Sequence, residues 1–315
     1  MFTPILKSRI WGGNKLRHLL NKNTNEHQIG ESWEISDVKG DVSVVTGGSF
    51  HGMSLSDLVE QYKDELLGRH NFERFGSKFP LLIKFIDART DLSIQLHPDD
   101  KLALSRHNSF GKNEMWYIMQ ADEQAKIIVD FNQCMNPSSY QKHLDEGTLP
   151  SVMNYEQVSP GDVFMIDVGR VHAIGAGVML AEIQQTSDVT YRLFDWNRLD
   201  NSGCPRELHT DLALEAINFE LPMNFRKTYD KSFNRSNPIV ECPYFSCNYL
   251  EINDKIEIIN KYDSFLIFIC IEGDLTVNFN QNKWNLVQGQ TLLIPAAVTS
   301  FEIDTSYAKL LEVYV

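Results

Sequence analysis

Short apolar stretches, each bounded by turn-forming residues, recur along the chain and constrain its fold more than any other feature. The clearest is residues 275–280, where apolar and polar side chains alternate with a period of two, as in a half-buried antiparallel strand. Similar runs, separated by Gly, Asn, Asp and Pro, occur at residues 80–86, 115–119, 126–131, 163–168, 265–271, 291–294 and 310–315. Many short strands of this kind predict a jelly roll or a barrel.

Helices are fewer and short. Residues 55–67 carry a helical apolar face, with Ser54 as the N-cap and Asp57 where a capping carboxylate belongs. A second helix is predicted from about Pro205 to Phe219, and residues 137–156 are predicted to form helical pieces between strands. We therefore expect an all-β dominated fold with short helical insertions at about residues 54–68, 137–156 and 205–220.

A polar segment at residues 224–237 separates two series of predicted strands. Residues 160–166 and residues 289–294 both place a glycine just before an apolar strand, which is a weak internal repeat. The repeat predicts two jelly rolls in tandem, a first domain over residues 1–225 and a second over residues 238–315. The second series carries no His at the equivalent place, so we expect no metal ligands there.

Composition excludes several classes of function. The 315 residues, 43% of them hydrophobic, suffice for one large or two smaller cores. The net charge of −13, without a long basic run, excludes nucleic acid as a partner, although local cations could still bind a small anionic substrate. The N-terminus lacks a signal-peptide pattern and no stretch of eighteen apolar residues occurs, which predicts a cytoplasmic protein without a membrane partner. Five cysteines without a C-x-x-C pair indicate neither a disulfide framework nor a Cys-based zinc site.

Four polar residues are spaced as ligands of one metal ion. Gln95 and His97 lie two positions apart on a predicted strand, so both side chains point to the same face. Glu114 begins the run at residues 115–119, and we expect a neighbouring antiparallel strand to present it to the same interior point. His172 follows a predicted strand and a glycine turn. Two imidazoles, a carboxylate and an amide oxygen form an open shell for a divalent transition metal.

Each of these residues alone is most often an ordinary polar side chain, but together they follow the ordered ligand pattern of the cupin barrel. Four phrases resemble, in order, signature segments of type I mannose-6-phosphate isomerases: residues 95–99, 111–117, 171–177 and 182–192. The resemblance extends to residues 11–13, 31–34 and 80–84, covers about the first 220 residues and is weak beyond them. It implies two tandem cupin (jelly-roll) β-barrels of the compact bacterial branch, because the chain lacks room for the large helical insert of longer members.

The resemblance also implies an activity and a site. It implies an aldose–ketose isomerase that interconverts mannose 6-phosphate and fructose 6-phosphate through a cis-enediol. As partners we expect only the small sugar phosphate and, if the chain is not a monomer, a second copy in a homodimer. The family's zinc ligands match the four residues above, implying one Zn²⁺ per chain, with another divalent metal as the alternative. The family's catalytic arginine matches Arg192, which Asp188 precedes, and its pocket lysine matches Lys112.

A metal holding the C1 and C2 oxygens would stabilise the enediolate. A proton shuttle must also lie near both carbons, and Glu182, Asp188, Lys112 and a metal-bound water are all candidates. Arg192 could hold the enediolate or the phosphate, because its guanidinium is a planar fork of donors. Further candidate substrate-binding residues are Lys84, Ser93 and Arg198.

Two alternative functions are weighed against this one. Another metal-dependent cupin enzyme, such as an iron oxygenase, would hold its metal with three His, or with two His and a carboxylate. The added Gln95 and the segment with Asp188 and Arg192 disfavour such an enzyme. A catalytically silent sugar-binding cupin with a regulatory role would not need an open metal site. Formation of fructose 6-phosphate from mannose 6-phosphate separates all three.

Overall fold

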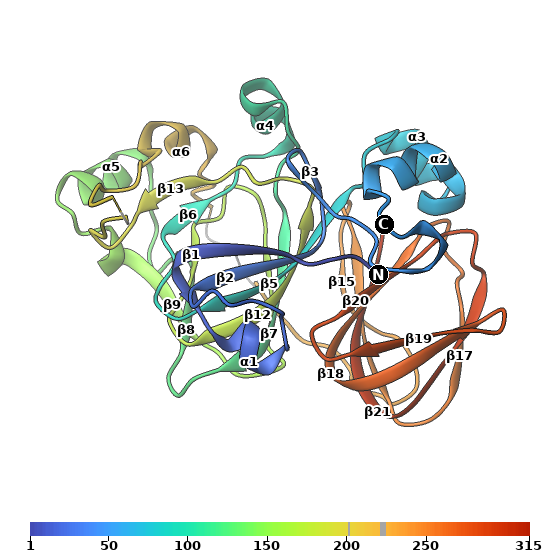
Figure 1. Ribbon diagram of the computed structural model, residues 1–315. Coiled ribbons are helices and arrows are strands. Elements are labelled where there is room, and N and C mark those ends of the chain that lie inside the picture. Colours follow the sequence, from blue (N-terminus) through green and yellow to red (C-terminus); the bar gives the residue numbers. More distant parts are fainter. Residues whose placement is uncertain (201, 221–224) are drawn as a thin grey trace.

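The computed structural model describes residues 1–200, 202–220 and 225–315, which form two β-rich lobes side by side (Figure 1). Three large sheets dominate, and the helices are short, so the predicted all-β dominated fold is confirmed. Within these residues, no helix is both long and apolar enough to span a membrane.

Two antiparallel sheets form the N-terminal lobe. The larger has seven strands in the order β1 (Ile5–Gly13), β2 (Ile29–Ile35), β5 (Leu81–Ala88), β12 (Val178–Gln185), β7 (Glu114–Ala121), β10 (Val163–Ile166) and β14 (Arg226–Lys227). The smaller has five, in the order β13 (Tyr191–Phe194), β6 (Ile94–Leu96), β11 (His172–Ile174), β8 (Lys126–Phe131) and β9 (Met153–Gln157). One apolar core holds residues of both, including Ile118 of β7 and Ile127 of β8, so the sheets face each other as in a jelly roll.

The C-terminal lobe is a further antiparallel sheet folded around its own apolar core. Its strands are β15 (Asn237–Glu241), β16 (Ser246–Ile252), β17 (Ile256–Ile259), β18 (Leu266–Phe279), β19 (Asn282–Val287), β20 (Thr291–Ile294) and β21 (Ser300–Tyr314). The predicted runs at residues 265–271 and 275–280 merge into the single long strand β18. Gly161 and Gly289 have φ of 91° and 83° just before β10 and β20, so the two phrases of the predicted repeat share a left-handed turn.

The two lobes share a continuous apolar core. Strands β5 and β12 are buried along their whole length. On one face Leu180 packs between the two N-terminal sheets, and on the other Phe85 and Ile183 join Ile267 and Leu311 of the C-terminal lobe. Burial of both faces explains why these strands are nearly continuous apolar runs rather than alternating ones.

The predicted helix at residues 55–67 is confirmed as α2 (Leu55–Leu67), with the capping box of Ser54 and Asp57. It is followed by α3 (Arg69–Phe75), and in Figure 1 both lie above the C-terminal lobe. The backbone N–H groups of Ala296 and Ala297 donate to the carbonyls of Leu66 and Glu65 at 3.0 and 2.9 Å, which ties this insertion to the second lobe. The remaining short elements are α1 (Lys15–Leu19), β3 (Asp37–Val38), β4 (Asp41–Val42), η1 (Gly48–Phe50) and α4 (Asp100–His107).

Two helical predictions need correction. The helix expected from about Pro205 is confined to α6 (Thr210–Ala216). The segment before it is non-helical because His209 exchanges two hydrogen bonds with the backbone of Arg192 on β13, at 2.7 and 3.1 Å. Residues 137–156 contain the expected α5 (Pro137–Asp145) and η2 (Leu149–Val152), but from Met153 onward they form strand β9, which pairs with β8. Residue 224, where the polar segment begins, lies outside the described residues, and the boundary between domains at residues 225–238 stays a prediction.

Candidate metal centre

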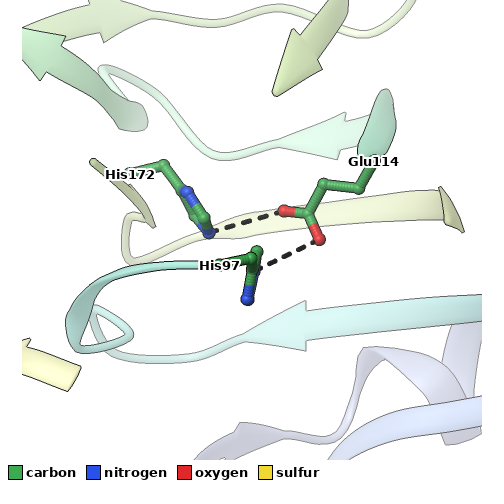
Figure 2. A group of neighbouring side chains, drawn as sticks. All are labelled: His97, Glu114 and His172. Atoms are coloured by element: carbon green, nitrogen blue, oxygen red, sulfur yellow. Dashed lines mark ion pairs between the residues drawn. The ribbon is translucent and has the colours of Figure 1, made fainter. Parts of the chain in front are cut away.

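The four predicted ligands come from both N-terminal sheets. His172, the first residue of β11, lies opposite Gln95 of β6 in register, and His97 follows β6 directly. Glu114 begins β7, which belongs to the seven-stranded sheet rather than to a strand neighbouring β6. The expectation of a neighbouring strand was therefore wrong, since Glu114 reaches the histidines from the facing sheet, across the interior of the lobe (Figure 2).

The donor atoms of three of these residues converge. His97 Nε2 lies 3.5 Å from Glu114 Oε2, and His172 Nε2 lies 3.5 Å from Glu114 Oε1. All three side chains are buried, and their donor atoms lie within 4.8 Å of one another. Ligands at about 2.0–2.2 Å from a tetrahedral zinc ion are separated by roughly 3.4 Å. The spacing fits one divalent metal ion.

Hydrogen bonds orient both imidazoles toward Glu114. His97 Nδ1 donates to the carbonyl of Val189 at 2.8 Å, and His172 Nδ1 donates to the carbonyl of Arg170 at 2.9 Å. Each Nε2 is therefore the unprotonated ring nitrogen, whose lone pair can bind a metal ion, as in most histidine metal ligands. Among the described residues, Glu114 Oε1 is buried without a hydrogen-bond partner. An orphaned carboxylate oxygen between two Nε2 atoms is suited to a cation.

The electrostatics of these ligands agree with that arrangement. Burial lowers the pKa of His172 to about 4 and lowers the pKa of His97 well below its usual range. Burial and the nearby Glu182 carboxylate raise the pKa of Glu114, against the opposing effect of Lys112. The histidines are thus neutral at physiological pH, which is the form that binds metals. The raised pKa of Glu114 means that its charged carboxylate would be stabilised by a cation bound beside it.

Gln95 completes the set in position. Its amide Nε2 lies 3.5 Å from His172 Nε2, and Ser93 Oγ donates to its Oε1 at 3.3 Å. Rotating the amide by half a turn exchanges nitrogen and oxygen without moving the rest of the side chain. In that orientation Gln95 presents its oxygen to the same point as the histidines.

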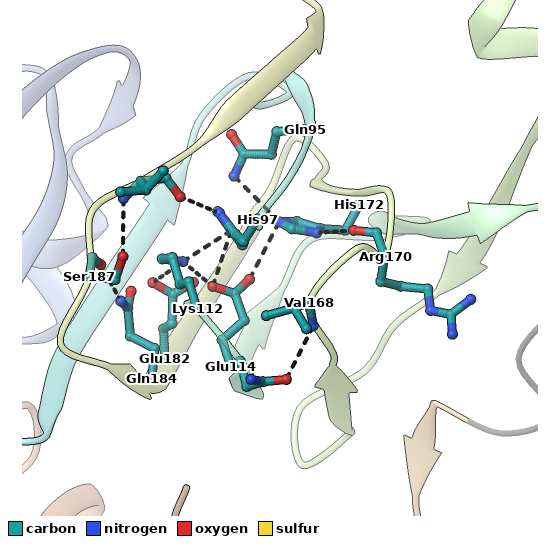
Figure 3. Close-up of polar contacts among 12 residues, drawn as sticks. Gln95, His97, Lys112, Glu114, Val168, Arg170, His172, Glu182, Gln184 and Ser187 are labelled. Atoms are coloured by element: carbon teal, nitrogen blue, oxygen red, sulfur yellow. Dashed lines mark hydrogen bonds and ion pairs between the residues drawn. The ribbon is translucent and has the colours of Figure 1, made fainter. Parts of the chain in front are cut away.

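A polar pocket of about 350 Å³ lies next to the ligands. The predicted residues that line it are Lys84, Ser93, Gln95, Lys112, Glu182, Asp188 and Arg192. Lys112 joins the pocket to the ligands, because its Nζ contacts the Glu114 carboxylate and lies 3.2 Å from His97 Nε2 and 3.7 Å from Glu182 Oε1 (Figure 3).

Glu182 is held as an anion inside this pocket. Burial would raise the pKa of its carboxyl group, but Lys112, Lys84 and a 2.9 Å hydrogen bond from Trp116 Nε1 outweigh burial and lower it to about 2. Lys84 Nζ lies 3.2 Å from Glu182 Oε1. Burial lowers the pKa of Lys84, but Glu182 and Glu31 raise it by more. Both side chains therefore stay charged.

Among the predicted catalytic and substrate-binding residues, only Arg198 does not line this pocket. Its guanidinium donates to Asp195 Oδ1 at 2.6 Å and to the carbonyl of Asp91 at 2.5 Å, and these bonds hold it beside the pocket. Conversely, sequence reasoning did not predict several other pocket residues, among them Arg9, Trp11, Glu31, Trp116, Thr190 and Arg206. Trp116 could have been found, since it lies two positions after Glu114 on one strand and so shares its face.

Two family models match the chain. The first, described as the catalytic domain of type I phosphomannose isomerase, matches residues 1–134. The second, described as the cupin domain of mannose-6-phosphate isomerase, matches residues 236–315.

Similar proteins cover nearly the whole chain. The mannose-6-phosphate isomerase ManA of Bacillus subtilis (strain 168) is 32% identical over 312 residues, which are 98% of this chain and 96% of the relative. The mannose-6-phosphate isomerase of Streptococcus mutans serotype c is 31% identical over 301 residues, 95% of this chain and 93% of the relative.

Solved structures share the architecture. The crystal structure of a mannose 6-phosphate isomerase from Bacillus subtilis matches with a TM-score of 0.91 and 30% identity, covering 100% of this chain and 98% of that one. A mannose 6-phosphate isomerase bound with zinc and yttrium matches with a TM-score of 0.79 and 16% identity, covering 99% and 98%. At that identity the second match shows a common fold alone.

Proposed function

The chain belongs to the type I mannose-6-phosphate isomerase family, and on this premise we propose that it interconverts mannose 6-phosphate and fructose 6-phosphate in a metal-dependent reaction through a cis-enediol. The observation that carries this proposal is the position of Lys112. It lines a pocket rich in cations and at the same time contacts His97 and Glu114 of the candidate metal centre. A sugar phosphate is an anion, and a metal at such a centre would stabilise the negative charge that develops on its reacting oxygens.

The resident metal is zinc, one ion per chain, held by Gln95, His97, Glu114 and His172 within residues 1–225. Two neutral imidazoles and a carboxylate are the ligands that catalytic zinc prefers, and the amide oxygen leaves the shell open to substrate. A zinc-bound protein of the same fold supports this choice of metal. When bound, the metal supplies Lewis-acid stabilisation of negative charge on the C1 and C2 oxygens.

The remaining site residues bind the sugar and move its proton. Lys112 and Glu182 act as the acid–base pair, because they face each other where the pocket meets the metal ligands. Lys84 holds Glu182 in place, and Ser93 orients Gln95. Arg192 lines the same pocket, where its planar fork of donors would stabilise negative charge that develops on the sugar oxygens.

A coupled assay for fructose 6-phosphate, run on protein as purified, after chelation and after zinc is restored, tests the proposal. Activity on mannose 6-phosphate that is lost on chelation and recovered with about one equivalent of zinc is the expected result. An oxygen-consuming reaction would instead identify another cupin enzyme. Sugar binding without turnover would identify a silent binding protein.

Transfer of deuterium from solvent into C2 of the sugar tests the acid–base pair. Lys112→Met and Glu182→Gln should abolish the exchange, measured by NMR, while Asp188→Asn keeps it. Loss of exchange in the Asp188 variant alone would assign the proton transfer to Asp188.

A further inference from the structure

Two arginines share one carboxylate at the edge of the pocket. Arg206 donates from Nε to Asp195 Oδ2 at 2.7 Å and from Nη2 to Asp195 Oδ1 at 2.5 Å. Arg198 donates to the same Oδ1 but is turned toward the carbonyl of Asp91. Only Arg206 lines the pocket, and its Nη1 donates to no group among the described residues. Asp195 therefore fixes the guanidinium of Arg206 and leaves one of its donor groups free for a ligand.

A second guanidinium near Arg206 makes this part of the pocket electropositive. Arg192 also lines it and has no carboxylate partner within the described part of the chain; its Nη1 donates to the carbonyl of Glu207 at 2.7 Å, and its buried Nε has no acceptor. Burial and then the charge of Arg206 lower the pKa of Arg192. The two guanidinium groups repel each other, and each has hydrogen-bond donors that are not used. A bound anion that accepts from these donors would stabilise both positive charges.

The other cations of the pocket already have acidic partners. Lys84 pairs with Glu182, Lys112 pairs with Glu114, and Arg9 pairs with Glu31 at 2.9 Å. Their charge is largely balanced within the protein. An anionic group on a ligand is therefore best accommodated near Arg192 and Arg206.

The strand register separates Asp195, the residue that anchors Arg206, from the row of residues beside the metal ligands. His172, Gln95 and Arg192 form one row across three neighbouring strands, because Gln95 pairs with both of the others. Asp195, which holds Arg206, lies three residues beyond Arg192, about 10 Å along the chain direction of β13. A hexose 6-phosphate likewise carries its reacting carbons C1 and C2 at one end and its phosphate at the other.

We propose that Arg206, positioned by Asp195, binds the phosphate of the substrate and makes the enzyme specific for phosphorylated sugars. This inference rests on the proposed function. Since the phosphate does not change during isomerisation, the contact is equally strong in ground and transition states and acts on KM rather than kcat.

Steady-state kinetics of Arg206→Gln test the assignment. A charged hydrogen bond contributes about 1.5–3 kcal/mol, so KM for mannose 6-phosphate should rise roughly 10- to 150-fold while kcat changes less than about twofold. The kcat/KM for unphosphorylated mannose should not change. Arg206→Lys should recover part of the loss through its charge. A fall in kcat at constant KM, or equal losses with both sugars, would overturn the proposal.

Arg198→Gln is the matched control, since it removes the other cation from Asp195 without changing the pocket lining. Its inhibition constant for inorganic phosphate should stay within about twofold of wild type, whereas Arg206→Gln should weaken phosphate inhibition at least tenfold. Equal weakening in both variants would refute direct contact.

Calorimetry with inorganic phosphate and metal-loaded protein separates the phosphate subsite from the proposed function. Phosphate binding that depends on Arg206, in a protein without isomerase activity, would reject only the proposed function. Unchanged phosphate binding in an active Arg206→Gln enzyme would reject only the subsite.

Discussion

At the scale of single residues, the geometry of the candidate metal centre depends on the hydrogen bonds that orient its histidines as much as on the ligands themselves. The carbonyls of Val189 and Arg170 fix which nitrogen of His97 and His172 faces Glu114. Such partners set the tautomer and orientation of a metal ligand. One ring nitrogen of each histidine is therefore held by the backbone, and the other faces the candidate metal position.

Replacing His172 with Ala should remove metal and activity together while the fold persists. Loss of one ligand weakens an open site, and activity should fall at least about a hundredfold. Metal analysis, the isomerase assay and thermal unfolding, each compared with chelated wild-type protein, measure the three effects. A variant that retains full metal content would show that His172 is not a ligand.

Arg192→Ala should lower kcat roughly 100- to 1,000-fold with metal content unchanged, the scale of losing one preorganised donor to developing charge. Arg192→Lys should recover little, because a point charge cannot replace a planar fork. Both kinetic constants must be measured. A raised KM with kcat intact would instead place Arg192 on the phosphate, beside Arg206.

At the scale of elements, the insertion formed by α2 and α3 belongs structurally to the second lobe. The carboxylate of Asp263, between β17 and β18, accepts hydrogen bonds from the backbone N–H groups of Arg69 and His70 at 2.8 and 3.0 Å. These are N-terminal donors of α3 that have no partner within the helix. A residue distant in sequence therefore caps this helix.

Asp263→Ala should lower the free energy of unfolding by about 1 kcal/mol, as for other lost helix caps. The backbone N–H groups of His70 and Arg69 lower the pKa of Asp263 below 3.8 in the folded state. Its contribution is therefore complete above the unfolded pKa and is lost as the pH falls through the folded pKa. Urea denaturation at neutral and acid pH should show the difference from wild type shrinking in acid. A difference that persists at the lowest pH would contradict capping by the charged carboxylate.

At the scale of the whole molecule, the seven-stranded sheet packs on both of its faces, against the five-stranded sheet and against the second lobe. A buried ion pair reinforces the contact between lobes. Lys22 Nζ donates to Glu34 Oε1 and to the carbonyl of Gly289, both at 2.6 Å. The first two residues belong to the N-terminal lobe and the glycine to the C-terminal lobe.

Lys22→Met should cost about 3–5 kcal/mol of stability, because it leaves the carboxylate of Glu34 buried without its cation. Lys22→Met combined with Glu34→Gln should cost much less than the sum of the single changes. Urea denaturation of the four proteins measures the coupling. Additive losses would mean that Lys22 and Glu34 are not energetically coupled.

Local signals in the sequence were sufficient for many of the strands, for helix α2 and for choosing the residues proposed as metal ligands. Alternation at period two identified the strands, and the spacing of Gln95 and His97 on one strand places both on one face whatever the tertiary fold. The predicted helix from Pro205 was wrong because hydrogen bonds to β13, which no local pattern reveals, override helical propensity in residues 205–209.

The sequence by itself determined the β-rich fold class, the family and the residues proposed as ligands, because each depends on residues close together in the chain or on ordered motifs. Only the tertiary structure decided how these meet. It brings Glu114 from the facing sheet, turns Arg198 away to Asp195 and adds Arg206 to the pocket. The physical reason is that charge pairing and burial act between atoms close in space, and in an antiparallel fold such atoms come from segments far apart in sequence.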